Sequence, residues 1–127
     1  MQISELQIDD EHDTISANDP LALAAKKILG LARGVLVVVQ DGKPLGTMSD
    51  SHLLLALYSN IDCRDEICKN HMDSNFLAVN LTDTIEEVSK AMKHKKPSAV
   101  VVVDESGMLS GYFSPNDYRE LLSSLSS

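Results

Sequence analysis

The sequence lacks any apolar stretch that could cross a membrane. Its apolar runs, such as Val35–Val39, fall far short of the roughly 18 residues that a membrane-spanning helix needs. Residues 1–13 are acidic and have no signal-peptide character. We therefore expect a cytoplasmic protein with no membrane partner. The length of 127 residues and the apolar content of 43% suit one compact domain, or two half-domains that share a core.

Basic side chains are scarce. The chain has 11 lysines and arginines against 19 aspartates and glutamates, which gives a formal net charge of −8. Nucleic-acid binding depends on clustered lysine and arginine, so we expect no nucleic-acid partner. A small anionic ligand is still compatible with this charge, because a local pocket can oppose the overall field.

Cysteine is rare as well. The two cysteines, Cys63 and Cys68, are too few for a disulfide scaffold. With His71 they make a Cys-x4-Cys-x2-His pattern, which offers three candidate zinc ligands. Structural zinc sites usually have four ligands in close pairs, so we favour two reduced thiols in a connecting segment and expect no metal.

The motifs of common enzymes are missing. Neither the Gly-x-Gly-x-x-Gly nor the Gly-x4-Gly-Lys-Ser/Thr phosphate-binding motif occurs, and there is no Gly-x-Ser-x-Gly nucleophile motif. The 4 histidines are scattered and form no His-x-x-x-His pair. We therefore expect no enzyme activity and no required cofactor.

One pattern occurs twice in the chain. Val35–Val39 and Val100–Val103 each lead through a turn to a second apolar segment and then to an apolar run. Gly46 and Gly111 occupy the same position in the two copies. A unit of about 60 residues buries too little surface to be stable alone. We expect two repeats, residues 1–62 with an N-terminal extension and residues 63–127, to pack with pseudo-two-fold symmetry.

Each copy is expected to fold as strand, helix, strand, turn, strand and helix, an α/β (α+β) arrangement. The valine runs lack alternation, which is typical of strands covered on both faces. The first helix of the first copy should start at Asn18-Asp19-Pro20, with a polar cap before a first-turn proline. In the second copy, Thr84 and Glu87 fit a capping box. The last helices should start at Ser49 and Ser114.

The segment from Gly111 to Asp117 has the best features for binding. A glycine in a strand permits close approach by a backbone or a ligand. Ser114 opens a helix whose first N–H groups are free, and Asp117 lies on the same side of the first turn. A carboxylate only accepts hydrogen bonds, so it can hold both hydroxyls of a ribose. The same residues also fit a helix cap with Pro115 at the first helical position, and the two roles are compatible.

In order and duplication, these segments resemble a tandem pair of CBS (cystathionine β-synthase) domains, also called a Bateman module. The resemblance covers about residues 10–124. It rests on Asp65-Glu66-Ile67 through His71-Met72, on Leu81 to Ile85, on Val101 to Gly107 and on Gly111 to Asp117. It implies a βαββα unit in each half.

The resemblance also implies a ligand in the cleft between the repeats: AMP, ADP, ATP or S-adenosylmethionine. Asp117 would hold the ribose hydroxyls, and Ser114 would help to bind ribose or phosphate. The purine would lie near the first strand and the start of the central strand of the second copy. The ligand-binding residues expected on this basis are Ser114, Asp117, Asn116, Thr82, Val79, Ser98, Ala99 and Val100.

The first copy departs from this pattern because His52 replaces the acid. An imidazole cannot accept two ribose hydroxyls as a carboxylate does, and Asp50 is a poor substitute. Losing a paired acceptor typically costs ~1–3 kcal/mol. We expect the first site, made of Ser49, Asp50 and His52, to be weak, empty or altered. His52 could contact a phosphate when protonated, or it could cap the helix.

Two functions follow from these features. The first is a stand-alone regulatory module that binds an adenosine-containing ligand and changes its association with itself or with a separate effector protein. The resemblance implies a homodimer formed through the helices. The alternative is a nucleotide-free dimerisation or scaffold module that acts on a separate partner. The middle positions of the ligand motif lack lysine and arginine, which favours adenosine or a monophosphate over a polyphosphate.

Overall fold

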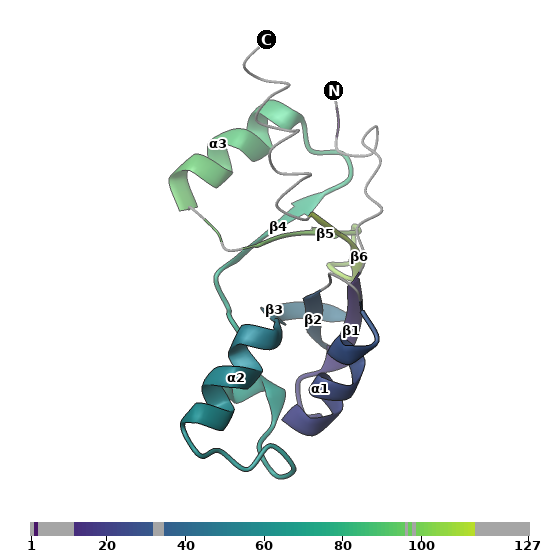
Figure 1. The fold of residues 1–127 in the computed structure, drawn as a ribbon. Coiled ribbons are helices and arrows are strands. Elements are labelled where there is room, and N and C mark those ends of the chain that lie inside the picture. Colours follow the sequence, from purple (N-terminus) through teal and green to yellow (C-terminus); the bar gives the residue numbers. More distant parts are fainter. Residues whose placement is uncertain (1, 3–11, 32–34, 96, 98, 114–127) are drawn as a thin grey trace. The chain divides into compact units, whose positions relative to one another are not determined.

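The computed structural model describes Gln2 and residues 12–31, 35–95, 97 and 99–113. The chain forms two compact units. The N-terminal unit is Glu11–Ser74, and the C-terminal unit is Asn75–Ser127 together with Met1–Asp10. Each unit contains a small sheet with helix packed against one face (Figure 1).

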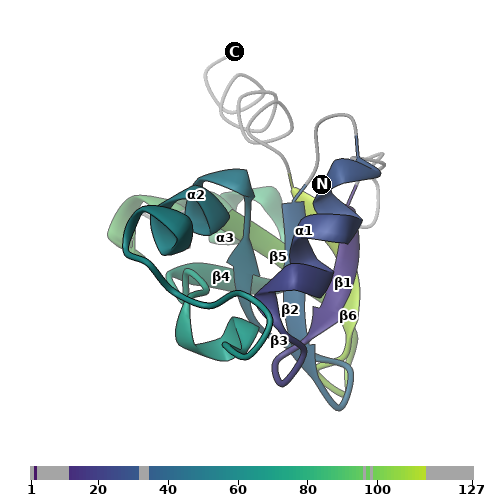
Figure 2. The ribbon, with the colours of Figure 1, turned by 60° about the horizontal axis from the view of Figure 1, so that its bottom comes forward.

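The N-terminal unit is a three-stranded sheet covered by two helices. Its strands lie in the order β1-β2-β3, with β1 parallel to β2 and β2 antiparallel to β3. Figure 2 shows α1 in front of the sheet. The elements are β1 (His12–Ser16), α1 (Leu21–Leu29), β2 (Val35–Gln40), β3 (Lys43–Met48), α2 (Asp50–Tyr58) and the short 3-10 helix η2 (Cys68–Asn70).

The C-terminal unit repeats this topology. Its strands lie in the order β4-β5-β6, with β4 parallel to β5 and β5 antiparallel to β6. The duplicated strand, helix, strand, turn and strand predicted from the sequence is therefore confirmed. The last predicted helix, from Ser114, lies outside the described residues. The elements are β4 (Phe76–Asn80), α3 (Ile85–Lys95), β5 (Ala99–Val103) and β6 (Leu109–Phe113).

The core of each unit lies between the sheet and its helices. Alternate strand residues point to the helices, whose apolar positions three and four apart meet them. Val37 and Val101 point the other way and are also fully buried. The central strands are thus covered on both faces, as the valine runs predict. The two core clusters include Ile15, Leu36, Val38 and Met48 with Leu21, Ala24, Leu53 and Ala56, and Val79, Val100 and Val102 with Ile85, Val88 and Met92.

The helix starts are capped in two different ways. The capping box on α3 is confirmed: the Thr84 N–H donates to Glu87 Oε2 and the Glu87 N–H donates to Thr84 Oγ1, both at 3.2 Å. The start predicted for α1 is wrong in detail. Pro20 itself is the N-cap residue, and no side chain caps the helix.

Backbone carbonyls from a distant segment cap α1 instead. The Leu21 N–H donates to the Glu66 carbonyl at 2.9 Å, and the Ala22 N–H donates to the Cys63 carbonyl at 2.8 Å. These bonds satisfy amides that have no partner inside a helix. No local sequence pattern predicts such a cap, because its acceptors lie more than 40 residues away in the chain.

Residues 63–73, which we call the lead segment, belong to the N-terminal unit although the sequence assigns them to the second repeat. Ile67 bridges Pro20, and Asp73 pairs with Thr47 through two backbone hydrogen bonds of 2.9 Å. In the C-terminal unit, Gln2 bridges Thr84 at the start of α3. Each unit therefore includes a segment that the sequence assigned to the other repeat. The predicted repeat boundary after residue 62 does not coincide with the unit boundary after Ser74.

Gly46 lets the lead segment approach β3. A Cβ atom at this position would lie 2.7 Å from the Asp73 carbonyl oxygen and 2.8 Å from Met72 Sδ. The backbone oxygen has little freedom to move, because both backbone groups of Asp73 are bonded to Thr47. The sequence predicted such a close approach for Gly111. At Gly46, the equivalent position of the first repeat, the approaching group is a backbone.

We expect Gly46→Ala to destabilise the protein by about 1–3 kcal/mol, the usual cost of forcing an extra carbon into a packed site. Urea unfolding followed by circular dichroism measures the change. Gly30→Ala is the matched control, because a Cβ there would lie at an ordinary 3.4 Å from the Lys27 oxygen and the φ of −81° suits alanine. Equal stability of the two variants would contradict the tight contact at Gly46.

Candidate functional site

The ends of three strands meet at one edge of the C-terminal sheet. Phe76 pairs with Ala99, and Val100 pairs with Phe113, so β4 and β5 begin where β6 ends. We call this the motif edge, because β6 ends there with residues 111–113, the first residues of the predicted ligand motif. Ala99 and Val100 lie there, as predicted. Their side chains are buried, so their backbones are the groups suited to a ligand.

Two predicted residues lie away from the motif edge. Val79 pairs with Val102, one position from the other end of β4, and its side chain is in the core. Thr82 follows the end of β4. Four residues of strand separate the two edges, or about 13 Å. The structure therefore does not bring Thr82 together with Ala99. Ser98, Ser114, Asn116 and Asp117 lie outside the described residues.

Lys95 brings a positive charge to the motif edge. It is the last residue of α3, and its Nζ donates a hydrogen bond to the Phe76 carbonyl. The same Nζ lies 5.8 Å from the centroid of the Phe76 ring. The basic run at Lys93–Lys95 signals a helix end in the sequence. Lys95 lies beside the first residue of β4 because α3 runs back along the sheet, in the direction opposite to β4.

The equivalent edge of the N-terminal sheet carries a histidine cap. Leu36 pairs with Met48, and Ser49 follows as the N-cap of α2. The Ser49 N–H donates to His52 Nδ1 at 2.9 Å. The Ser49 hydroxyl lies 2.8 Å from the Ser51 hydroxyl.

Of the two roles left open for His52, this geometry is that of a cap. Its Nδ1 is occupied as an acceptor by the helix start, in the place that glutamate or glutamine takes in a capping box. Asp50 is exposed in the first turn of α2. The position of the ligand-holding acid therefore has no free carboxylate in this repeat.

The two cysteines are free thiols in different surroundings. Cys68 is fully buried, and its thiol donates to the Pro20 carbonyl at 3.8 Å. Burial, with a smaller contribution from Asp19, raises the pKa of Cys68 to about 11. His71 faces Glu66 at 3.6 Å. Within the described ranges, no three histidine, cysteine or acidic side chains are grouped so that they could hold a metal ion.

Comparison with known proteins identifies the class of this fold. Residues 65–124 match the sequence model of the CBS domain. No curated protein matches the chain. Among solved structures, the CBS domain protein PAE2072 from Pyrobaculum aerophilum, complexed with AMP, is 22% identical with a TM-score of 0.77, and the match covers 99% of this chain and 98% of that one.

Two further CBS domain pairs have a similar structure. The pair of protein MJ0100, in complex with 5′-methylthioadenosine and S-adenosyl-L-methionine, is 20% identical with a TM-score of 0.73 over 98% of both chains. The CBS domain pair/ACT domain protein TM0892 from Thermotoga maritima is 17% identical with a TM-score of 0.72 over 100% of both.

Residues 65–124 are therefore a CBS domain, and the whole chain has the fold of a CBS domain pair, the tandem arrangement called a Bateman module. This confirms the fold class inferred from the duplicated sequence, and it confirms the CBS family for residues 65–124. No described helix is both long and apolar enough to span a bilayer.

The buried thiol predicts a dependence of stability on alkaline pH. The pKa of Cys68 is raised from 9.0 to about 11, so the folded state holds the proton that the unfolded state loses. This contribution to stability is complete below pH 9 and falls by up to about 3 kcal/mol as the pH rises to 11. Urea unfolding across this range should show a smaller fall for Cys68→Ala than for the unmodified chain. Cys63→Ala is the control and should keep the full fall.

Proposed function

We propose that this protein is a regulatory module, without enzyme activity, that binds one adenosine-containing ligand at the motif edge of its second CBS repeat. The observation that carries the proposal is the CBS match over residues 65–124, which includes the whole segment from Gly111 to Asp117. Support comes from the two CBS structures whose bound molecules are AMP, 5′-methylthioadenosine and S-adenosyl-L-methionine.

Asp117 and Ser114 take the specific roles in this proposal. The Asp117 carboxylate accepts hydrogen bonds from both ribose hydroxyls, because it has acceptors and no donor. Ser114 and the amides of the helix that the sequence predicts after it donate to ribose or phosphate. Ser98, Ala99 and Val100 offer backbone groups to the purine at the start of β5. The sequence predicts that Asn116 belongs to the first turn of that helix.

Lys95 favours a ligand with a phosphate. Its Nζ lies at the first residue of β4, where it is bonded to a backbone carbonyl and not to a carboxylate. A phosphate can compete for this ammonium group more easily than for one already held in an ion pair. Among AMP, ADP, ATP and S-adenosylmethionine we therefore favour AMP, since a single described cation at this edge suits a monophosphate better than a polyphosphate.

The first repeat does not form an equivalent site in this proposal. His52 holds the Ser49 amide, and Ser49 is engaged by the neighbouring Ser51 hydroxyl. A ligand would have to displace this cap and would still find no carboxylate for its ribose. We therefore propose one ligand per chain.

Isothermal titration calorimetry with AMP, ADP, ATP and S-adenosylmethionine tests the site. We expect one ligand per chain and an affinity loss of about ten- to a hundredfold in Asp117→Asn, since a charged acceptor becomes a weaker neutral one. Asp50→Asn is the matched control, because it removes an acid from the equivalent turn of the first repeat, and it should bind normally. If none of the four ligands binds, or if Asp117→Asn binds as tightly as the unmodified chain, the proposed site is wrong.

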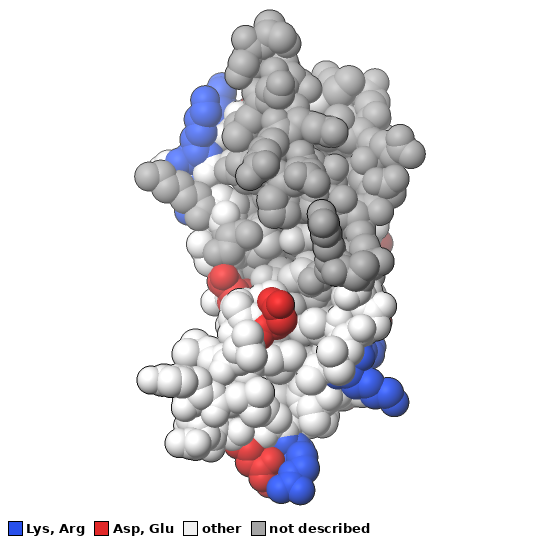
Figure 3. All heavy atoms as spheres, in the orientation of Figure 1, with Lys and Arg blue, Asp and Glu red and all other residues white. Residues whose placement is uncertain are grey.

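A second function, dimerisation, is favoured by the outer face of α2. Leu54, Leu55 and Leu57 are 60–64% exposed and Tyr58 is 86% exposed, while the same helix buries Leu53 and Ala56. A helix that is apolar all round is normally covered on all sides. The surface over α2 carries few charges (Figure 3). We propose that a second copy of the chain covers it, because an uncharged patch can pair with itself despite the net charge of −8.

Sedimentation velocity tests the dimer. We expect Leu54→Glu combined with Tyr58→Glu to weaken self-association by about a hundredfold or more, because two large apolar contacts are replaced by facing negative charges. Ser51→Glu, which adds charge to the exposed first turn of the same helix, should leave the dimer intact. The unmodified chain should be measured over a 100-fold range of concentration that ends at its solubility limit. If it sediments as a monomer at every concentration, this interface is excluded.

A further inference from the structure

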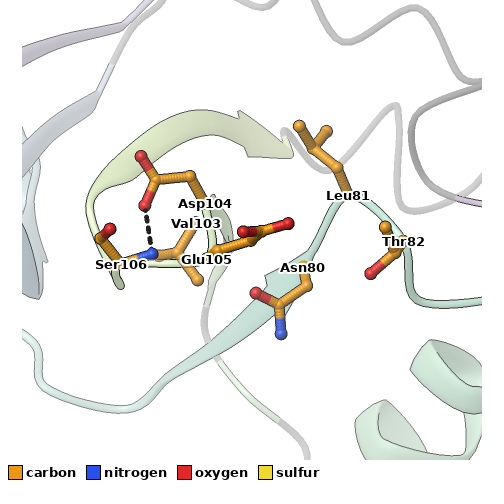
Figure 4. A pocket seen from close by; sticks show the side chains of 7 residues that line it. All are labelled: Asn80, Leu81, Thr82, Val103, Asp104, Glu105 and Ser106. Carbon is orange, nitrogen blue, oxygen red and sulfur yellow. Dashed lines mark hydrogen bonds between the residues drawn. The ribbon is translucent and has the colours of Figure 1, made fainter.

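The opposite edge of the C-terminal sheet holds a cavity that the proposed adenosine site does not use. Asn80 pairs with Val103, so the turns that follow β4 and β5 leave the sheet side by side. Between them is a cavity of about 680 Å³ that is open to solvent and has a volume within the range of small-molecule sites. It is lined by Asn80, Leu81, Thr82, Val103, Asp104, Glu105 and Ser106 (Figure 4).

The walls of this cavity are held by hydrogen bonds from backbone N–H groups to two aspartate side chains. Asp104 Oδ1 accepts from the Ser106 N–H at 2.8 Å and from the Met108 N–H at 3.0 Å. On the other side, Asp83 Oδ2 accepts from the Asn80 N–H at 2.8 Å. The carboxylates of Asp83 and Asp104 therefore stabilise the two turns. A ligand would meet walls that are already ordered, which lowers the entropy cost of binding.

Four polar side chains in the lining keep their hydrogen-bonding capacity. Within the described part of the chain, no hydrogen bond or ion pair engages the Asn80 amide, the Glu105 carboxylate, or the hydroxyls of Thr82 and Ser106. Glu105 extends from the turn after β5 toward Asn80 and Leu81 (Figure 4). The Glu105 carboxylate thus reaches across from the turn after β5 toward the segment that follows β4 (Figure 4).

The chemistry of the lining restricts the kind of ligand. The cavity has two carboxylates and no lysine, arginine or histidine, so it repels phosphate groups and differs from the motif edge. Free acceptors call for a ligand that brings N–H donors, and Glu105 calls for one that is positively charged. Leu81 and Val103 offer apolar contact to a short aliphatic chain.

We propose that this cavity binds a small organic cation that carries amine or guanidinium donors on an aliphatic chain. Glu105 pairs with the cationic group, and Asn80 and Thr82 on the facing segment accept further N–H groups. The site is independent of the adenosine site, from which it is separated by the length of β4 and β5. Thr82, which the sequence placed with the adenosine ligand, belongs to this second site.

Titration of the full chain with agmatine, followed by ¹H–¹⁵N NMR, tests the proposal. Agmatine has a guanidinium group, an ammonium group and no carboxylate. We expect saturable shifts of the amides of Asn80, Thr82, Glu105 and Ser106, and at least a fivefold loss of affinity in Glu105→Gln. Glu86→Gln is the matched control, because it neutralises an exposed acid on α3 outside the cavity, and it should bind as the unmodified chain does.

Three outcomes would overturn the proposal. The first is the absence of saturable shifts up to 10 mM agmatine, which corresponds to a binding free energy of only about 3 kcal/mol. The second is equal affinity in Glu105→Gln and Glu86→Gln. The third is the same shifts with tetramethylammonium, a cation without N–H donors. Asp117→Asn should bind agmatine normally, so that failure of the adenosine site and failure of this site are distinguished.

Discussion

The backbone pairing of Thr47 with Asp73 determines much of the structure around it. The two hydrogen bonds hold the lead segment on β3, and this contact leaves no room for a side chain at residue 46. The same segment supplies the carbonyls that cap α1. Two residues after Asp73 the chain begins the C-terminal unit, and one residue after Thr47 it reaches the end of β3. The pairing therefore joins the last strand of one repeat to the start of the next.

Strand register determines which residues can act together. The parallel pairing of β4 with β5 and the antiparallel pairing of β5 with β6 bring Phe76, Ala99 and Phe113 to one edge. The same register sends Thr82 and Glu105 to the other edge. One small sheet thus presents a cation at one end and carboxylates at the other, which gives its two edges opposite preferences for charged ligands.

The duplication produces two similar sheets and two different motif turns. In the first repeat, His52 and Ser49 satisfy each other at the start of α2. In the second repeat, the sequence keeps serine and aspartate at the corresponding positions. Because the His52 side chain caps α2, the first repeat has a capped helix start without an acid at this position. The two repeats therefore share an architecture and differ in the residues of their motif turns.

The sequence alone predicted the strands, the hairpins, the helices α1, α2 and α3 and the CBS family, because valine runs, turn glycines and the Thr84 capping box are local patterns. It also singled out Gly46 and the substitution of His52 for an acid. Only the tertiary structure decided that distant carbonyls cap α1, that residues 63–73 fold with the first repeat, and that Thr82 and Ala99 lie at opposite edges. These features depend on register and on contacts between distant residues, which leave no periodic signal in the chain.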